Sequence, residues 1–122
     1  MPLVRIDVIA PKTDDHKRAL LAATRRAIVE GLAAEDRRVV VRVVDTARGD
    51  MDLPSCRTER FTVVDILLYE GRSPEMKAAT ATALRAALEV DPGIEPSEVA
   101  VFFHDATTSD LDVLPGQADL QV

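Results

Sequence analysis

The chain has 122 residues, of which 30% are charged and 47% apolar, and it carries a net charge of −6. This length predicts a single domain, residues 1–122, with one hydrophobic core. No apolar run approaches the roughly 20 residues of a membrane span, and the basic residues are spread out, so neither a membrane nor a nucleic acid is expected as a partner. Residues 1–5 lack the pattern of a secretory signal, and a cytoplasmic location is expected.

Metal and disulfide chemistry find little support in the sequence. Cys56 is the only cysteine, which excludes an internal disulfide and a cysteine-based zinc site. The two histidines, His16 and His104, are isolated, and two isolated histidines do not make a metal site. We therefore expect no metal.

The first half of the chain is predicted to form a strand, a helix and a strand. Residues 3–10 are strand-like, and Thr13 is a helix N-cap followed by two acidic residues. The helix that begins there has apolar side chains every three to four residues. A second strand is predicted over residues 39–44, followed by residues 46–60, which are rich in turn-forming residues.

The second half restarts the same pattern. Residues 62–69 predict a strand, and Ser73-Pro74-Glu75 begins a helix with proline at its first position. Residues 99–103 predict the last strand. His104 and Asp105, which follow it, are typical of a solvated strand end.

Repeat 1 (residues 2–45) aligns with repeat 2 (residues 62–105) at a constant difference in residue number and without a gap. The coinciding positions include Thr13 with Ser73 and Asp45 with Asp105. We interpret this self-similarity as a duplication. It predicts an α/β fold of the α+β type: tandem β-α-β units forming a four-stranded, mainly parallel sheet with two helices on one face.

The other face of this sheet must also be covered. Only 3% of the residues are aromatic, and both predicted helices are used on the first face. Neighbouring subunits are the natural cover, so a closed oligomer is expected.

Four segments together resemble a known family. They are Met1-Pro2-Leu3 at the start, Glu35-Asp36-Arg37 before the second strand, Gly71-Arg72-Ser73 before the second helix, and the tail from 105 to 120. The chain resembles the tautomerase superfamily and, within it, the fused malonate semialdehyde decarboxylase and 4-oxalocrotonate tautomerase group. The resemblance implies the tautomerase fold, a homotrimer, a small carboxylic acid as substrate and no cofactor.

Pro2 is the most informative residue. Methionine before proline is normally removed, which would leave a secondary amine. A free α-amine has a pKa of about 7.7 to 8.0, and burial favours its neutral form, which can act as general base and then acid. Pro2 is expected to open an edge strand, and the alternative is that this is its only role. If Met1 remains, no prolyl amine exists.

The resemblance assigns carboxylate binding to Arg72, whose guanidinium can hold a carboxylate through two hydrogen bonds and stabilise a developing enolate. Its alternative role is that of a solvated turn residue or a partner of Glu70. Lys12 occupies the same position in the first half and is expected to be a weaker anion contact.

The resemblance also assigns proton transfer or water positioning to Asp36, and a carboxylate in an apolar site can do that work. Aspartate between a helix and a strand is also a common turn former. We expect Phe103, Leu111 and Val113 to line the apolar wall of the substrate pocket.

The chain departs from the family pattern at several positions. Decarboxylase-like members have two arginines near the second turn, whereas Tyr69 and Glu70 stand here where the first would fall. Phe102 and Val29 replace a tyrosine and a histidine of the dehalogenase-like members, which argues against hydrolytic dehalogenation.

The prediction is a keto-enol tautomerase acting on a small 2-oxo or enol carboxylic acid, with Pro2, Arg72 and Asp36 as its catalytic residues. One alternative is a decarboxylase of the malonate semialdehyde type. Another is a non-catalytic trimer that binds a small acid or a protein on the same scaffold.

Overall fold

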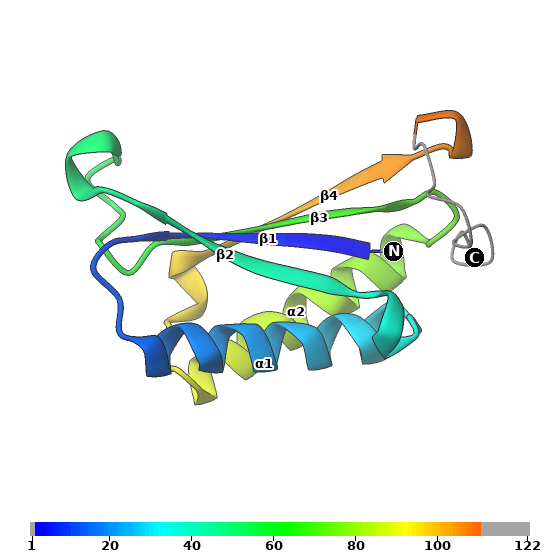
Figure 1. The fold of residues 1–122 in the computed structure, drawn as a ribbon, viewed down its shortest axis with the longest axis horizontal. Coiled ribbons are helices and arrows are strands. Elements are labelled where there is room, and N and C mark those ends of the chain that lie inside the picture. The colour runs from blue at the N-terminus through cyan, green and yellow to red at the C-terminus, as the bar shows by residue number, and fades with distance from the viewer. Residues whose placement is uncertain (1, 111–122) are drawn as a thin grey trace.

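The computed structural model describes residues 2–110, and Figure 1 shows it as two layers, a sheet and a pair of helices on one of its faces. The first half contains β1 (Pro2–Ile9), α1 (Asp14–Gly31) and β2 (Val40–Thr46). The second half contains β3 (Thr62–Tyr69), α2 (Pro74–Val90) and β4 (Val99–Ala106). Short 3-10 helices precede and follow β2 and β4: η1 (Asp36–Arg38), η2 (Arg48–Asp50), η3 (Pro96–Glu98) and η4 (Thr108–Asp110).

The four strands form one sheet in the order β2-β1-β3-β4. β1 is parallel to β2 and β3 is parallel to β4, whereas the central β1 and β3 are antiparallel. The predicted fold, a mainly parallel four-stranded sheet with both helices on one face, is confirmed.

One sequence-based expectation about the sheet is wrong. β1 is an interior strand, whereas Pro2 was expected to open an edge strand, because the antiparallel pairing between the two halves places β1 beside β3. Pro2 is tolerated there because it is the first residue of the strand, directly opposite Leu68, where the missing N–H group interrupts the ladder least.

The two halves begin their helices in the same way. Thr13 Oγ1 accepts a hydrogen bond from the His16 backbone N–H at 3.1 Å, and Ser73 Oγ accepts one from the Met76 backbone N–H at 3.1 Å. Each cap satisfies a backbone donor that has no partner within the helix. The N-terminal positions of both helices are therefore fixed by short sequence motifs at equivalent positions of the two repeats.

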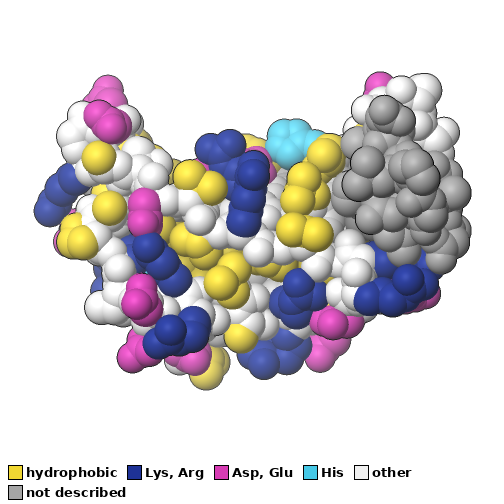
Figure 2. Space-filling view, in the orientation of Figure 1, with side chains coloured by type: hydrophobic (Ala, Val, Ile, Leu, Met, Phe, Trp, Pro, Cys, Tyr) yellow, Lys and Arg dark blue, Asp and Glu magenta, His cyan; other side chains and the backbone are white. Residues whose placement is uncertain are grey.

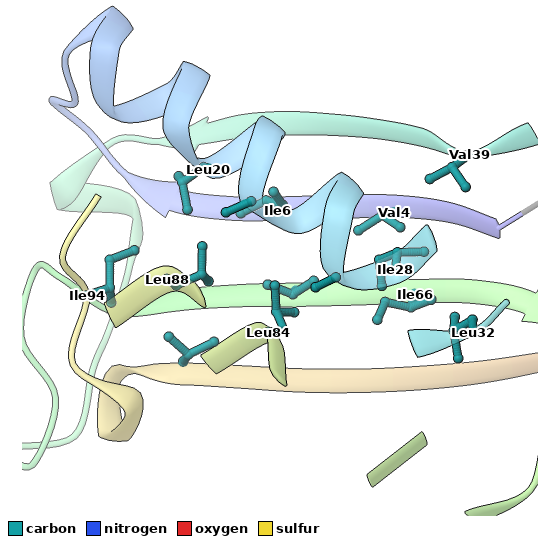
Figure 3. Close-up of a cluster of buried hydrophobic side chains, with 14 of the residues drawn as sticks. Val4, Ile6, Leu20, Ile28, Leu32, Val39, Ile66, Leu84, Leu88 and Ile94 are labelled. Carbon is teal, nitrogen blue, oxygen red and sulfur yellow. The ribbon is translucent and has the colours of Figure 1, made fainter. Parts of the chain in front are cut away.

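The hydrophobic core lies between the sheet and the helices (Figure 3). Alternate residues of the central strands, such as Ile6 and Ile66, point into it and are fully buried. They meet side chains of both helices, including Leu20, Ile28, Leu84 and Leu88. Each large apolar side chain removed from water contributes about 1.5–3 kcal/mol, so this layer is the main source of stability.

The two helices approach closely at the end of α1. A Cβ atom at Gly31 would lie 2.4 Å from Thr80 Oγ1 and 2.9 Å from Thr80 Cβ, so no larger residue fits without movement. This contact fixes the C-terminal end of α1 relative to α2.

The sheet face opposite the helices carries apolar and polar side chains. Figure 1 shows no helix of residues 2–110 over it, and it lies at the top of Figures 1 and 2 between two raised ends. The strand register places these apolar residues on it: Leu3, Val40, Val44, Val63, Leu67, Ala100 and Phe102. Val40 and Phe102 are each 51% exposed, so part of this face is apolar surface open to solvent.

Candidate active site

The three predicted catalytic residues lie at one end of the molecule. Pro2 begins β1 there, and its partner Leu68 lies near the end of β3. The turn carrying Arg72 follows β3, and η1 with Asp36 leads into β2, whose first residue, Val40, pairs with Leu3. Figure 1 shows this end at the right, beside the N-terminal label.

Pro2 is buried on the helix side of the sheet, the same side as Val4 and Leu68. The burial is relevant to an amine at this position, because removing water disfavours its charged form.

Arg72 is held against the end of α1. The preceding Gly71 has a φ of +123°, a conformation that glycine adopts readily and other residues rarely do. The Arg72 Nε and Nη2 atoms lie 3.3 and 3.4 Å from the Leu32 carbonyl oxygen, where the dipole of α1 is negative.

The Arg72 guanidinium has no carboxylate partner within residues 2–110, and Glu70 is not paired with it. Its long bonds to one backbone carbonyl leave most of its donor capacity unused. The group is thus positioned, half-buried and able to accept a carboxylate.

Asp36 is held by an arginine of α1. Arg25 Nη1 lies 3.2 Å from Asp36 Oδ1, and the same guanidinium donates to the backbone oxygens of Asp36 and Val39 at 2.8 and 2.7 Å. The Asp36 side chain is 73% exposed, so in the single chain it does not lie in an apolar environment. The structure shows an oriented surface carboxylate.

Lys12 lies at the other end of the sheet. It follows the C-terminal end of β1, so the whole strand, on the order of 20 Å at about 3.3 Å per residue, separates it from Pro2. Its ammonium group donates to the Glu59 carbonyl oxygen at 3.0 Å. Within one chain, Lys12 does not converge with Pro2, Arg72 and Asp36.

The predicted apolar wall is only partly within the described residues. Phe103 lies opposite Ile66 on the helix side of β4 and packs, half-buried, against the core. Its neighbour Phe102 lies on the opposite, exposed face. Leu111 and Val113 lie outside the described residues.

Sequence reasoning missed two arginines with defined contacts. Arg25, to which no role was assigned from the sequence, holds Asp36 and β2. A signal existed, because Arg85 stands at the equivalent position of the second repeat and donates to the Val99 carbonyl oxygen at 3.1 Å in the same way. Arg60 precedes β3 and donates to the Gly93 carbonyl oxygen. That contact depends on tertiary structure and has no sequence signal.

Among residues 2–110, His, Cys, Asp and Glu side chains nowhere gather in the groups of three that would suggest a metal site. Over the same residues, neither helix combines the length and apolar character of a membrane span.

The sequence model of a family described as "Tautomerase enzyme" matches residues 41–111, more than half of the chain. The chain belongs to this tautomerase family. The matched segment contains Arg72 and ends within the tail, and it does not include Pro2 or Asp36. Membership therefore rests on the second β-α-β unit and the strand before it. No curated protein sequence matches the chain.

Solved structures resemble this tautomerase over nearly its whole length. A crystal structure of malonate semialdehyde decarboxylase is 25% identical, with a TM-score of 0.85 over 97% of this chain and 95% of the other. A fused 4-OT described as a wild-type symmetric trimer is 27% identical, with a TM-score of 0.81 over 93% of each chain. A second malonate semialdehyde decarboxylase, inhibited by 3-bromopropiolate, is 22% identical with a TM-score of 0.82 and 93% and 90% coverage, which shows the shared fold.

Proposed function

We propose that this tautomerase catalyses keto-enol interconversion of a small 2-oxo carboxylic acid without a cofactor. One observation carries the proposal: Pro2 is buried at the end of the sheet where Arg72 lies without a carboxylate partner among the described residues. A base and a carboxylate-binding group at one site are what proton transfer next to a carbonyl requires.

The reaction would use the Pro2 nitrogen as base and then as acid. The neutral amine takes a proton from C3 of the 2-oxo acid, the electrons of the broken C–H bond form the C2–C3 double bond, and negative charge develops on the C2 oxygen. The protonated amine then delivers the proton to the C2 oxygen, which gives the enol and regenerates the neutral amine, and ketonisation runs the same steps in reverse. Arg72 holds the substrate carboxylate and stabilises the enolate charge.

Asp36 is proposed to orient a water molecule or assist proton transfer. Arg25 fixes its carboxylate, which supports a positioning role. Its exposure in the single chain means that a dry environment has to come from another subunit.

We also propose that the protein is a homotrimer. The apolar residues on the helix-free face and the trimeric state described for the similar fused 4-OT support this assembly. Light scattering on the purified protein should give three times the chain mass, and a monomer at micromolar concentration would contradict it. A cytoplasmic location remains a prediction from the sequence.

Decarboxylation of a 3-oxo acid such as malonate semialdehyde is the second candidate. The similarity to malonate semialdehyde decarboxylase over 97% of the chain favours it. In that reaction the protonated amine would polarise the carbonyl while the C–C bond to the carboxylate breaks and CO2 leaves. The electron pair of that bond forms the enolate, which is then protonated on carbon to give the aldehyde. Release of CO2 from malonate semialdehyde distinguishes it from proton transfer.

The test combines intact mass and activity. Protein made from the native start codon should lack the mass of Met1 and should accelerate the ketonisation of phenylenolpyruvate, followed by the loss of enol absorbance. A chain that retains Met1 and gives no acceleration would overturn the enzymatic proposal and favour the non-catalytic binding scaffold. Loss of Met1 without ketonisation but with CO2 release would favour the decarboxylase.

A further inference from the structure

A cationic pocket lies at the end of the molecule opposite Pro2. It has a volume of about 290 Å³ and lies between the loop after β1, the first turn of α1 and the segments before β3 and after α2. Lys12, His16 and Arg60 contribute its basic groups, and Pro92 and Ile94 form an apolar side. None of these residues takes part in the chemistry proposed for Pro2.

The internal repeat makes this pocket the counterpart of the candidate active site. Lys12 corresponds to Arg72, and Thr62 corresponds to Pro2. Pro92 corresponds to Leu32, whose carbonyl oxygen contacts Arg72. Equivalent residues therefore surround the two places, although Lys12 donates to the Glu59 carbonyl oxygen and not to that of Pro92.

The cations of the pocket are not neutralised by carboxylates. Lys12 and Arg60 donate to the backbone oxygens of Glu59 and Gly93, and neither forms an ion pair within residues 2–110. Lys12 is partly and Arg60 largely accessible to solvent, so both cations can contact an anion that enters the pocket, and such an anion would reduce their mutual repulsion.

His16 records this positive field. Its pKa is lowered from the ordinary value of 6.5, first by burial and then by the charges of Lys12 and Arg60, while Asp91 acts in the opposite direction. The His16 Nε2 atom is also buried without a hydrogen-bond partner. An unsatisfied buried nitrogen costs free energy, which a bound acceptor would relieve.

The pocket lacks a catalytic amine. The nitrogen of Thr62, at the position of Pro2, is a backbone amide within the chain, and its hydroxyl donates to the Arg60 carbonyl oxygen at 3.0 Å. Arg60 lies just before this position, so a cation stands near the counterpart of Pro2. The groups that remain can bind an anion but cannot supply the proposed proton transfer.

We infer that this pocket is a second, non-catalytic site that binds a small multiply charged oxyanion between Lys12, Arg60 and His16. A dicarboxylate or a phosphate offers the several acceptor oxygens that these donors require. The apolar side formed by Pro92 and Ile94 favours a dicarboxylate with a short carbon chain.

The imidazole NMR signals of the full-length protein test this inference. They should be followed while malonate or inorganic phosphate is added at constant ionic strength, with chloride as the monovalent anion. His104 lies outside the pocket, so its signal serves as the internal reference. The signal that disappears in His16→Gln is that of His16. The His16 signal should shift saturably and its pKa should rise, because a bound anion favours the imidazolium form.

Variants of matched charge make the result specific. Lys12→Gln and Arg60→Gln should each weaken anion binding by about tenfold, as loss of a charge-assisted hydrogen bond does. Arg18→Gln removes the same charge from an exposed position on α1 and should change binding less than twofold. Tighter binding of malonate than of phosphate identifies a carboxylate ligand, and the reverse order identifies a phosphate.

Two results would overturn the site. One is a His16 shift that does not saturate, or that chloride reproduces at the same ionic strength. The other is equal weakening by Arg18→Gln and Lys12→Gln, which would reflect net charge alone. Either readout is independent of ketonisation, so failure of the proposed enzymatic activity would leave this test intact.

Discussion

The two halves of the molecule have nearly the same scaffold and different ends. Lys17 pairs with Asp45 at 2.6 Å, and at the equivalent positions Lys77 pairs with Asp105 at 2.7 Å. At the ends of the sheet the halves diverge, because Pro2 and Arg72 lie at one end, whereas Thr62 and Lys12 occupy the equivalent positions at the other. One scaffold thus carries different residues at its two ends, and only the end at Pro2 can gain a free amine through removal of Met1.

Substitutions at the Pro2 end should have the largest effect. Pro2→Ala and Arg72→Ala should each lower the ketonisation rate at least about a hundredfold, as loss of a general base or of a charge stabiliser does. Arg72→Lys introduces the residue type found at the equivalent position of the first half, Lys12. Its ketonisation rate should be little higher than that of Arg72→Ala, because an ammonium group cannot form the two parallel hydrogen bonds. Measured kcat/KM values check both.

The control for these variants is Arg26→Ala, which removes an exposed arginine of α1. Its kcat/KM should match that of the unmodified protein. Rates for Pro2→Ala and Arg72→Ala within twofold of it, in folded protein, would remove the proposed mechanism.

The close contact between the helices lies at the end of α1, and its disruption should have the next largest effect, this time on stability. Gly31→Ala places a Cβ within 3.0 Å of three Thr80 side-chain atoms, so it should lower the free energy of unfolding by about 1–3 kcal/mol, as overpacking does. Gly49→Ala is the matched control, since its Cβ would meet no atom within 4 Å. Chemical denaturation of both variants measures the difference, and equal midpoints would show that the helices can separate without cost.

The paired Lys-Asp contacts should contribute least to stability among the repeated features. Their side chains are between 21% and 42% exposed, and ion pairs of this exposure contribute about 0–1 kcal/mol. Double-mutant cycles with Lys17→Gln and Asp45→Asn, and with Lys77→Gln and Asp105→Asn, should give similar couplings that fall with salt. A coupling well above about 1 kcal/mol in only one half would show that the two halves are not energetically equivalent.

Most of the fold was predictable from sequence because its signals are local. The strand over residues 62–69 and the helix starts at Thr13 and Ser73 were correct to the residue, since alternation and capping depend on near neighbours. β4 is longer than predicted, extending to Ala106, because the polar residues His104 and Asp105 were taken as a strand end. In the folded chain, His104 contacts Asp65 of β3 and Asp105 pairs with Lys77 of α2, contacts that are not visible in the sequence.

The candidate site was less predictable because it depends on how the halves meet. The antiparallel pairing of β1 with β3 brings Arg72 to the end where Pro2 lies, and it sends Lys12 to the other end. Sequence equivalence suggested that Arg72 and Lys12 contact the same substrate, whereas the pseudo-twofold arrangement of the halves places them at opposite ends of the sheet. The orientation of Phe103 toward the core also follows from register rather than from residue type.

The smallest expected effect is a pH dependence carried by His16, which has Met76 as its counterpart. Because the pKa of His16 is lowered in the folded protein, the unfolded chain binds more protons between that pKa and 6.5. Stability should therefore fall as the pH drops below about 6.5, and this part of the slope should vanish in His16→Gln. Denaturation midpoints at pH 7.5 and 5.5 measure it, with His104→Gln as the control.

Added malonate should reduce the slope in the unmodified protein, because an anion in the pocket stabilises the protonated imidazole. An unchanged slope in His16→Gln would mean that neither burial nor the charges of Lys12 and Arg60 lower the pKa of His16 in solution.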